Sequence, residues 1–290
     1  MQFLIFNISF PFLWIISILP FRLFYWFSDG IYYLVYYGIG YRKKIVRHNL
    51  SIALPHLSDK ERLAIEKKFY QHMCDVFLEM IKTISISSEE MKKRFVITNI
   101  ELLKEYEQKN KSVILLASHY ASWEWLLSIN ESTSFKCYGV YKKLSNKYFD
   151  AKVRAIRSKF KSELVTTSKT ISLIQENETK GIVSLYGLAS DQSPQVHKTY
   201  HWQKFMGIEV PVHTGAEMLA KKYDLDVLFA QVRKVKRGYY EATFVPISTA
   251  SKSIPNYEIT DTYLNEVEKQ IIEAPEYYFW THKRWKHRKS

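Results

Sequence analysis

Cysteine is scarce in this sequence: Cys74 and Cys137 are the two copies among 290 residues, and they lie far apart. A disulfide framework or a cysteine-ligated zinc site needs more cysteines at closer spacing, so both are excluded. We therefore expect a reduced protein whose main domain faces the cytoplasm. No internal repeat, low-complexity tract or linker interrupts residues 42–290, and this continuity predicts a single domain there.

Acidic residues are too few to balance the basic ones. The chain has 29 Asp and Glu against 42 Lys and Arg, a net charge of +13. A basic surface suits acidic lipids, a phosphorylated substrate, an acidic carrier protein or nucleic acid. No helix-turn-helix, zinc-finger or RNP-type motif occurs, so we expect no nucleic-acid partner.

Charged residues are absent from the first 21 positions, where Ile, Leu, Phe and Trp dominate. A bilayer-spanning helix needs roughly 20 such residues. The features of a cleavable signal peptide are missing, so we expect the segment to stay attached. An aromatic run over 31–41 suits a membrane interface, and Arg42, Lys43 and Lys44 after it should face the cytoplasm. Residues 1–41 are thus expected to form a transmembrane or interfacial anchor; a buried helix pair is the alternative.

The rest of the chain alternates between β-rich and helical segments. Strands are expected at 112–117, 137–141, 163–166, 181–185, 227–232 and 239–245. Helices are expected near 122–129, 147–160, 169–176 and 215–223. This order predicts an α/β fold with a mixed central sheet flanked by helices, its last two strands forming a hairpin. Ser58 and Glu61 form a capping box that should start an amphipathic helix.

A histidine and a carboxylate stand where an apolar strand gives way to a helix. His119 follows the strand 112–117, and Glu124 comes five residues later. Ligands of α/β sheets bind beyond the carboxyl ends of strands. Residues five apart on one helix point about 140° apart, so the pair can meet only if His119 lies on the loop. Glu124 would then hold one imidazole nitrogen and leave the other as a general base toward a hydroxyl.

The spacing of this pair is weak evidence by itself. With 29 acidic residues in 290, nine histidines give roughly one such match by chance. His56 and Glu61 make a second match, but His56 follows Pro55 and no strand precedes it. A surface His119 beside a solvated Glu124 is the alternative.

Further motifs accompany the pair. They are Arg47-His48-Asn49-Leu50 with Pro55 and Ser58; Val140-Tyr141-Lys142 with Asn146, Asp150 and Arg157; Asp191-Gln192; Phe205-Met206-Gly207; Thr214-Gly215 with Leu219-Ala220; and Ala274 to Lys286. Together they resemble the lysophospholipid acyltransferase superfamily, and within it the bacterial lipid A biosynthesis (late, lauroyl/myristoyl-type) acyltransferases. In that comparison His119 and Glu124 occupy the H-x4-D/E motif.

The resemblance implies a glycerol-phosphate-acyltransferase-like fold at the bacterial inner membrane. It implies transfer of a fatty acyl group from an acyl-carrier-protein or acyl-CoA thioester, a co-substrate rather than a cofactor, to a membrane lipid hydroxyl. Late acylation of a lipid A precursor is the expected reaction. Acylation of another envelope lyso-, glyco- or amino-lipid, thioester hydrolysis and a membrane-surface binding protein without chemistry are the alternatives.

The same motifs supply candidate substrate-binding residues: Arg157, Arg154, Lys142, Asp191 and Gln192. Arg154 and Arg157 fall three apart on one predicted helix, where they can clamp phosphate. The resemblance implies that Arg157 contacts the polar or phosphorylated part of a substrate. For Asp191 the alternative is a structural carboxylate that holds a basic residue.

Two segments depart from the family pattern. Residues 229–233 replace a proline-containing segment, which leaves the acceptor open. His197 and His201 are four apart and could hold a metal ion, but two ligands on a loop are more often solvated, so no metal is expected. The basic tail, 283–289, can lie on anionic lipid or be solvated.

Overall fold

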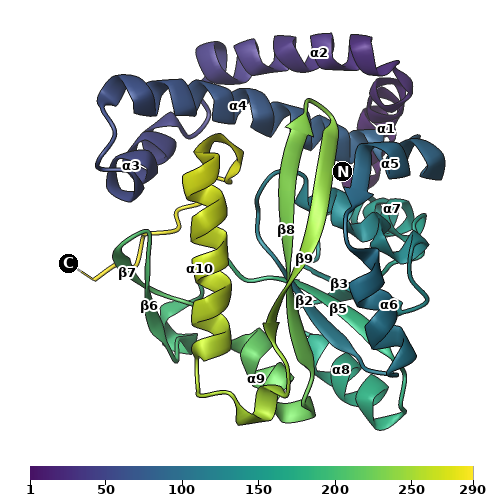
Figure 1. The fold of residues 1–290 in the computed structure, drawn as a ribbon. Helices are drawn as coiled ribbons and strands as arrows, with labels where there is room; N and C mark the ends of the chain where they lie inside the picture. Colours follow the sequence, from purple (N-terminus) through teal and green to yellow (C-terminus); the bar gives the residue numbers. More distant parts are fainter. Residues whose placement is uncertain (290) are drawn as a thin grey trace.

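A computed structural model describes residues 1–289, and at position 198 the backbone alone. Its centre is a seven-stranded mixed sheet in the order β1-β9-β8-β2-β5-β3-β4 (Figure 1). The strands are β1 (Phe95–Ile97), β2 (Val113–Ala117), β3 (Lys136–Tyr141), β4 (Glu163–Thr166), β5 (Ser184–Ala189), β8 (Asp226–Lys236) and β9 (Tyr239–Ser248). Neighbouring strands run parallel, apart from the antiparallel β8–β9 hairpin. β6 (Trp202–Phe205) and β7 (Ile208–Pro211) form a separate antiparallel pair.

Helices surround this sheet. The α-helices are α1 (Gln2–Ile18), α2 (Phe21–Tyr33), α3 (Lys43–Ala53), α4 (Asp59–Lys82), α5 (Ser88–Arg94), α6 (Ile100–Gln108), α7 (Lys147–Ser158), α8 (Thr170–Thr179), α9 (Gly215–Tyr223) and α10 (Glu258–Glu273). A π-helical turn, Leu34–Ile39, follows α2, and the 3₁₀ helix η2 covers Trp123–Glu131. β2 is buried along Val113–Leu116, as expected for a central parallel strand covered on both faces.

The mixed α/β architecture and the final hairpin match the sequence prediction. The capping box is also present, because the Ser58 hydroxyl accepts from the Glu61 N–H and the Glu61 carboxylate accepts from the Ser58 N–H. Three strands were not foreseen: β1 has three residues, and β6 and β7 carry Lys, Gln and Glu, which hide the strand pattern. β5 begins at Ser184, three residues later than predicted.

The expectation of a transmembrane helix within residues 1–41 is wrong for the structure. Among residues 1–289, no helix is both long enough and apolar enough to cross a bilayer. α1 ends at Ile18 because Pro20, at the start of α2, cannot continue it. Its 17 residues span roughly 25 Å, less than the ~30 Å hydrocarbon core.

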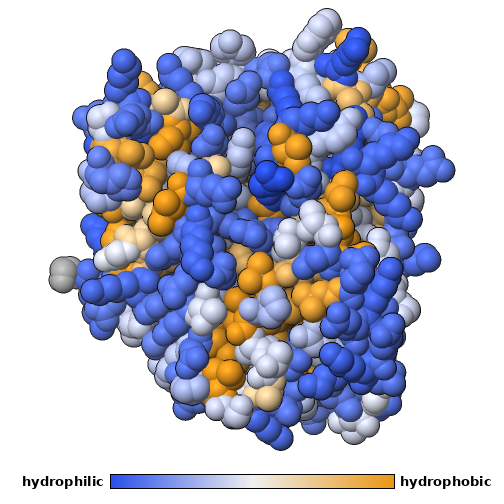
Figure 2. All heavy atoms as spheres, viewed as in Figure 1, coloured by the Kyte–Doolittle hydropathy of each residue, from blue (hydrophilic) through white to orange (hydrophobic). Residues whose placement is uncertain are grey.

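An apolar surface nevertheless covers the outer side of the N-terminal helices. Phe3, Leu4 and Phe12 on α1 are 58 to 64% exposed, and Trp26 on α2 is 73% exposed. Apolar side chains gather over α1 at the upper right of Figure 2. The interfacial half of the anchor prediction is compatible with this surface.

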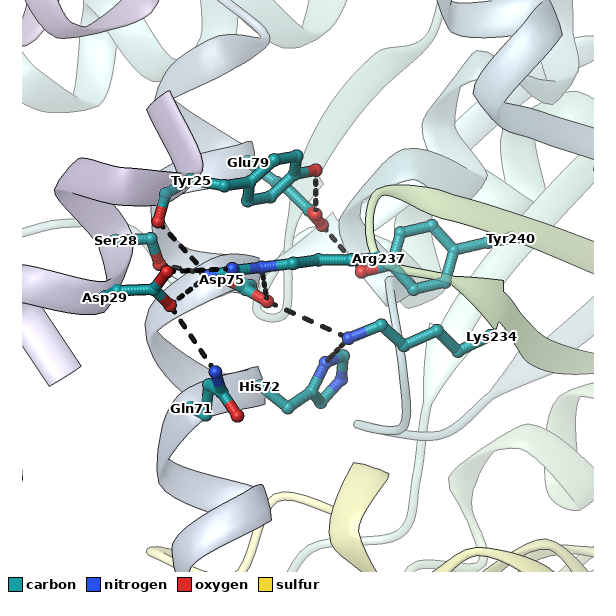
Figure 3. Close-up of polar contacts among 10 residues, drawn as sticks. All are labelled: Tyr25, Ser28, Asp29, Gln71, His72, Asp75, Glu79, Lys234, Arg237 and Tyr240. Carbon is teal, nitrogen blue, oxygen red and sulfur yellow. Dashed lines mark hydrogen bonds and ion pairs between the residues drawn. The ribbon is translucent and has the colours of Figure 1, made fainter. Parts of the chain in front are cut away.

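A partly buried ionic cluster fastens α2 to the body of the protein (Figure 3). Arg237, in the β8–β9 turn, lies between Asp29 of α2 and Asp75 of α4. Its Nη2 is 2.6 Å from Asp29 Oδ1 and 2.7 Å from Asp75 Oδ1, and its Nε donates to Asp75 Oδ2 at 2.9 Å. The carboxylates raise the pKa of Arg237 further above its ordinary value, although burial opposes them. One guanidinium thus joins three elements that are far apart in sequence.

A buried carboxylate sits beside this cluster. Glu79 accepts hydrogen bonds from the Tyr25 hydroxyl at 2.8 Å and the Tyr240 hydroxyl at 2.9 Å. Burial raises the pKa of Glu79 to about 7, and the neighbouring charge of Asp75 adds to the shift. Through the Glu79 carboxylate, Tyr25 thus links α2 to α4 and, by way of Tyr240, to the hairpin.

We expect Arg237→Ala to destabilise the fold by about 2–4 kcal/mol, because Asp75 would be left buried without its main cation. Urea unfolding followed by tryptophan fluorescence measures this change. Arg233→Ala is the matched control on the same hairpin: Arg233 is 65% exposed in its pair with Glu241, so it should cost less than about 1 kcal/mol. Equal losses of unfolding free energy for the two variants would contradict the stabilising role of Arg237.

Candidate active site

The geometry of the site follows from the register of two parallel strands. Ala117, the last residue of β2, pairs with Ala189, the last residue of β5. His119 lies two residues beyond the first strand and Asp191 two residues beyond the second. Because parallel strands end at one edge of the sheet, these residues leave the sheet at the same level and meet there.

His119 and Asp191 make two hydrogen bonds. His119 Nδ1 lies 2.8 Å from Asp191 Oδ1, and the His119 backbone N–H donates to Oδ2 at 3.2 Å. An ionised carboxylate accepts at Nδ1, so the proton belongs on that nitrogen and Nε2, at the other edge of the ring, is left as the base. Asp191 is fully buried, whereas the His119 side chain is 24% exposed.

Charge within this pair shifts both groups toward ionisation. Burial lowers the pKa of His119, but attraction to Asp191 and its hydrogen bond outweigh burial, so the pKa is raised above its ordinary value. Burial raises the pKa of Asp191, but the contacts with His119 outweigh it and hold the pKa low. The carboxylate is thus placed to stabilise the imidazolium that forms when Nε2 takes a proton.

The predicted hydrogen bond between Glu124 and the His119 imidazole is wrong. Glu124 does lie in the first turn of η2, but both its carboxylate oxygens are 2.6 Å from Nη2 of Arg157, on α7. Each of these two side chains is less than a fifth exposed. Asp191, predicted as a substrate-binding residue, takes the place next to the imidazole that was assigned to Glu124. The charge of Glu124 still helps to raise the pKa of His119.

A cavity of about 770 Å³ opens in front of His119. Four other sequence-predicted residues line it: Glu124, Arg157, Lys142 and Gln192. Arg154 does not; it lines a neighbouring cavity, and its Nε lies 3.4 Å from Asp150 Oδ2. The two arginines expected to form one clamp therefore serve different cavities.

A narrower apolar cavity of about 120 Å³ lies behind the Glu124–Arg157 pair, which lines both spaces. Two glycines form its floor. Gly139 of β3 and Gly187 of β5 pair across the sheet, and Leu115 and Leu164 flank them on β2 and β4. A Cβ at Gly139 would lie 2.9 Å from Leu127 Cδ2 and 3.2 Å from Leu164 Cδ2. The cavity exists because neither glycine puts a side chain on the sheet face.

The segment after α10 packs behind the catalytic loop. The Phe279 N–H donates to the His119 carbonyl at 3.1 Å, and the Ala121 N–H donates to the Tyr277 carbonyl at 3.0 Å. Asn49 Nδ2, from the motif at 47–50, donates to the carbonyls of Trp280 and His282, both at 2.8 Å. Motifs from the two ends of the chain thus hold the loop in place.

His282 fixes the other half of the pair. Its Nε2 accepts from the Ser193 N–H at 3.2 Å, two residues beyond Asp191. Burial lowers the pKa of His282 to about 4, so the ring is neutral and can accept at neutral pH. The predicted histidine pair behaves differently: His201 Nε2 lies 2.8 Å from Asp261 Oδ1 and its ring stacks on Tyr257, while His197 is exposed. Within residues 1–289 no three potential metal ligands gather.

Known proteins resemble this chain along most of its length. The profile of the family described as bacterial lipid A biosynthesis acyltransferase matches residues 2–287. Lipid A biosynthesis lauroyltransferase of Escherichia coli (strain K12) is 23% identical over 278 residues, covering 95% of this chain and 89% of that protein. Lipid A biosynthesis acyltransferase 2 of Shigella flexneri is 23% identical over 242 residues, covering 83% and 77%. The palmitoleoyltransferase of Escherichia coli (strain K12) is 23% identical, covering 85% and 79%.

Proposed function

The chain belongs to the bacterial lipid A biosynthesis acyltransferase family and is an acyltransferase, and we propose that it moves a fatty acyl group from a thioester to a hydroxyl of a lipid A precursor. The observation that carries the proposal is His119, held at Nδ1 by buried Asp191 and lining a cavity next to an apolar one. The donor is an acyl carrier protein or coenzyme A thioester. Both are anionic and suit the basic chain.

The reaction needs no nucleophile from the protein. His119 Nε2 takes the proton of the lipid hydroxyl as its oxygen attacks the thioester carbonyl carbon. The tetrahedral oxyanion forms beside the first turn of η2, where backbone N–H groups can stabilise it. The carbon–sulfur bond then breaks, and the imidazolium returns its proton to the departing thiolate. Asp191 stabilises the imidazolium throughout.

We assign the apolar cavity to part of the acyl chain of the donor. It is lined mainly by aliphatic side chains, including Leu126, Leu164 and Leu185, and it begins beside the reacting groups. The Glu124–Arg157 pair lies between it and the open cavity, so the acyl chain enters past this pair. Glu124 and Arg157 thereby position the thioester, and Glu124 acts on the imidazole only through its charge.

We place the enzyme on the cytoplasmic surface of the bacterial inner membrane. Exposed apolar side chains on α1 and α2 suit insertion among lipid tails. Arg42 and Lys43, which come after the π-helical turn, suit anionic headgroups, as does the basic tail. The lipid acceptor would then reach the cavity without crossing water.

Mass spectrometry of envelope lipids tests the function. We expect one lipid A species to lose a fatty acyl mass in cells that lack the gene, and to regain it with the wild-type gene but not with His119→Ala. In vitro, the purified enzyme should consume a thioester faster when the acceptor is present. If free fatty acid appears equally fast with and without acceptor, the enzyme is a thioesterase and the proposal fails. Full restoration of the acylated lipid A species by His119→Ala would show that His119 is not the catalytic base.

A further inference from the structure

A second polar chamber adjoins the catalytic cavity and has no part in the reaction described above. It has a volume of about 590 Å³ and lies between α7 and the loops that follow β3 and β4. Tyr141 and Thr166, the last residues of these parallel strands, are paired in register. Both loops therefore leave the sheet at the same level, which brings residues 142–143 and 166–169 to one chamber.

The chamber is strongly basic. Lys142, Lys143, Lys169 and Arg154 line it, against one carboxylate, that of Asp150. Asp150 is already engaged, because it accepts from the Leu144 N–H at 2.9 Å and pairs with Arg154. Within residues 1–289, no carboxylate lies within 4 Å of the three lysine ammonium groups. Three positive charges thus converge on one concave space without a protein anion to balance them.

Hydroxyl groups and the start of a helix complete the lining. Thr166, Thr167 and Ser168 contribute three hydroxyl groups. Ser168 and Lys169 directly precede α8, a ten-residue helix whose first turn is favourable to negative charge. Ammonium groups together with hydroxyl donors are the combination that binds phosphate oxygens in proteins.

The chamber communicates with the cavity of His119, because Tyr141, Lys142 and Thr167 line both. The start of α1 packs against α7, the helix that carries Asp150 and Arg154 of the chamber. Gln2 Nε2 donates to the Ser145 carbonyl at 3.3 Å, and the Phe6 ring packs 5.2 Å from that of Phe149 on α7. An amphiphile with its chains along α1 would therefore present its polar head to the chamber and the catalytic cavity together.

We propose that this chamber binds a phosphate ester on the lipid acceptor and so orients the reacting hydroxyl toward His119. The inference rests on the proposed acyl transfer and adds the group on the acceptor that the enzyme recognises. Removing two lysines should weaken capture of the phosphorylated acceptor and leave the chemistry unchanged.

The test compares Lys143→Gln/Lys169→Gln with Lys93→Gln/Lys104→Gln, a control that removes the same charge from exposed positions on α5 and α6. Acyl transfer is measured to a phosphorylated glucosamine-disaccharide lipid and to the same lipid after phosphatase treatment. For the chamber variant we expect the KM for the phosphorylated lipid to rise about tenfold or more, with kcat within about twofold. The KM for the dephosphorylated lipid and for the donor should stay unchanged, and the control should match wild type.

The inference is overturned if the KM values of both lipids rise equally, or if the KM of the thioester donor rises instead. A binding measurement separates it from the proposed function: His119→Ala protein is floated with vesicles that contain the phosphorylated or the dephosphorylated lipid. Preferential binding to the phosphorylated vesicles that the lysine variant loses supports the chamber even where no acyl transfer is found. Equal binding to both kinds of vesicle contradicts it.

Discussion

Asp191→Asn should lower kcat/KM by about 10²–10⁴-fold while the protein stays folded. An amide carries no charge to stabilise the imidazolium, and its N–H₂ group can present a donor to Nδ1, which favours the wrong tautomer. Steady-state acyl transfer measures the loss, and circular dichroism checks the fold. Asp261→Asn is the matched control, because Asp261 also holds a histidine at 2.8 Å, that of His201, away from the cavity. Its activity should stay within about twofold of wild type.

The pH profile distinguishes catalysis from a structural role. The active base is neutral His119, whose pKa is raised by Asp191. In wild type, kcat/KM should therefore fall as the pH drops through a value above the ordinary 6.5 for histidine. In Asp191→Asn burial remains and attraction is lost, so the acidic limb of the remaining activity should move to lower pH. Glu124→Gln should move it much less. A larger shift for Glu124→Gln than for Asp191→Asn would show that Glu124, and not Asp191, is the carboxylate that stabilises the imidazolium.

Gly139→Ala should shorten the acyl chain that the enzyme transfers. The added methyl group lies against Leu127 and Leu164, and their displacement narrows the apolar cavity. One methylene in a well-fitted pocket changes kcat/KM by roughly 10–200-fold. We expect a loss of about that size for the longest donor that wild type uses, and little loss for a donor two carbons shorter.

Donors of graded length, assayed in parallel, measure this selectivity. Gly30→Ala is the control, because a Cβ there meets no atom within 4 Å and the residue lies on α2, outside the cavity. An equal loss for every donor in Gly139→Ala would show general damage to the sheet, and the acyl chain would then belong elsewhere.

The sequence predicted His119 from its setting but assigned it the wrong carboxylate, because Glu124 is near in sequence and one misplaced strand boundary concealed Asp191. Placing a strand at 181–185 put Asp191 six residues beyond its end. With the strand at Ser184–Ala189, the distance is two residues, the same as between Ala117 and His119. The number of residues between a strand end and a site residue can be counted in the sequence only when the strand end is known. Strand ends are set by tertiary pairing, and Gly187 breaks the apolar pattern by which a strand is recognised.

Local signals predicted other features well. The Ser58 capping box and the β8–β9 hairpin depend on neighbours in sequence, and both are present. The Gly139–Gly187 pair and the basic chamber depend on which strands become neighbours, which spacing along the chain does not reveal. The predicted roles of Arg154 and Lys142 in substrate binding stay predictions, now tied to the chamber.

The packing of residues 275–284 behind the catalytic loop has a consequence for biosynthesis of the enzyme. The loop after β2 is synthesised well before its partners Tyr277 and Phe279, and Ser193 is synthesised well before its partner His282. Chains fold largely in the order of their synthesis. A nascent chain should therefore carry an incompletely held His119–Asp191 pair until residues 277–282 have been synthesised, so chains that stop before them would not consume the cell's thioesters.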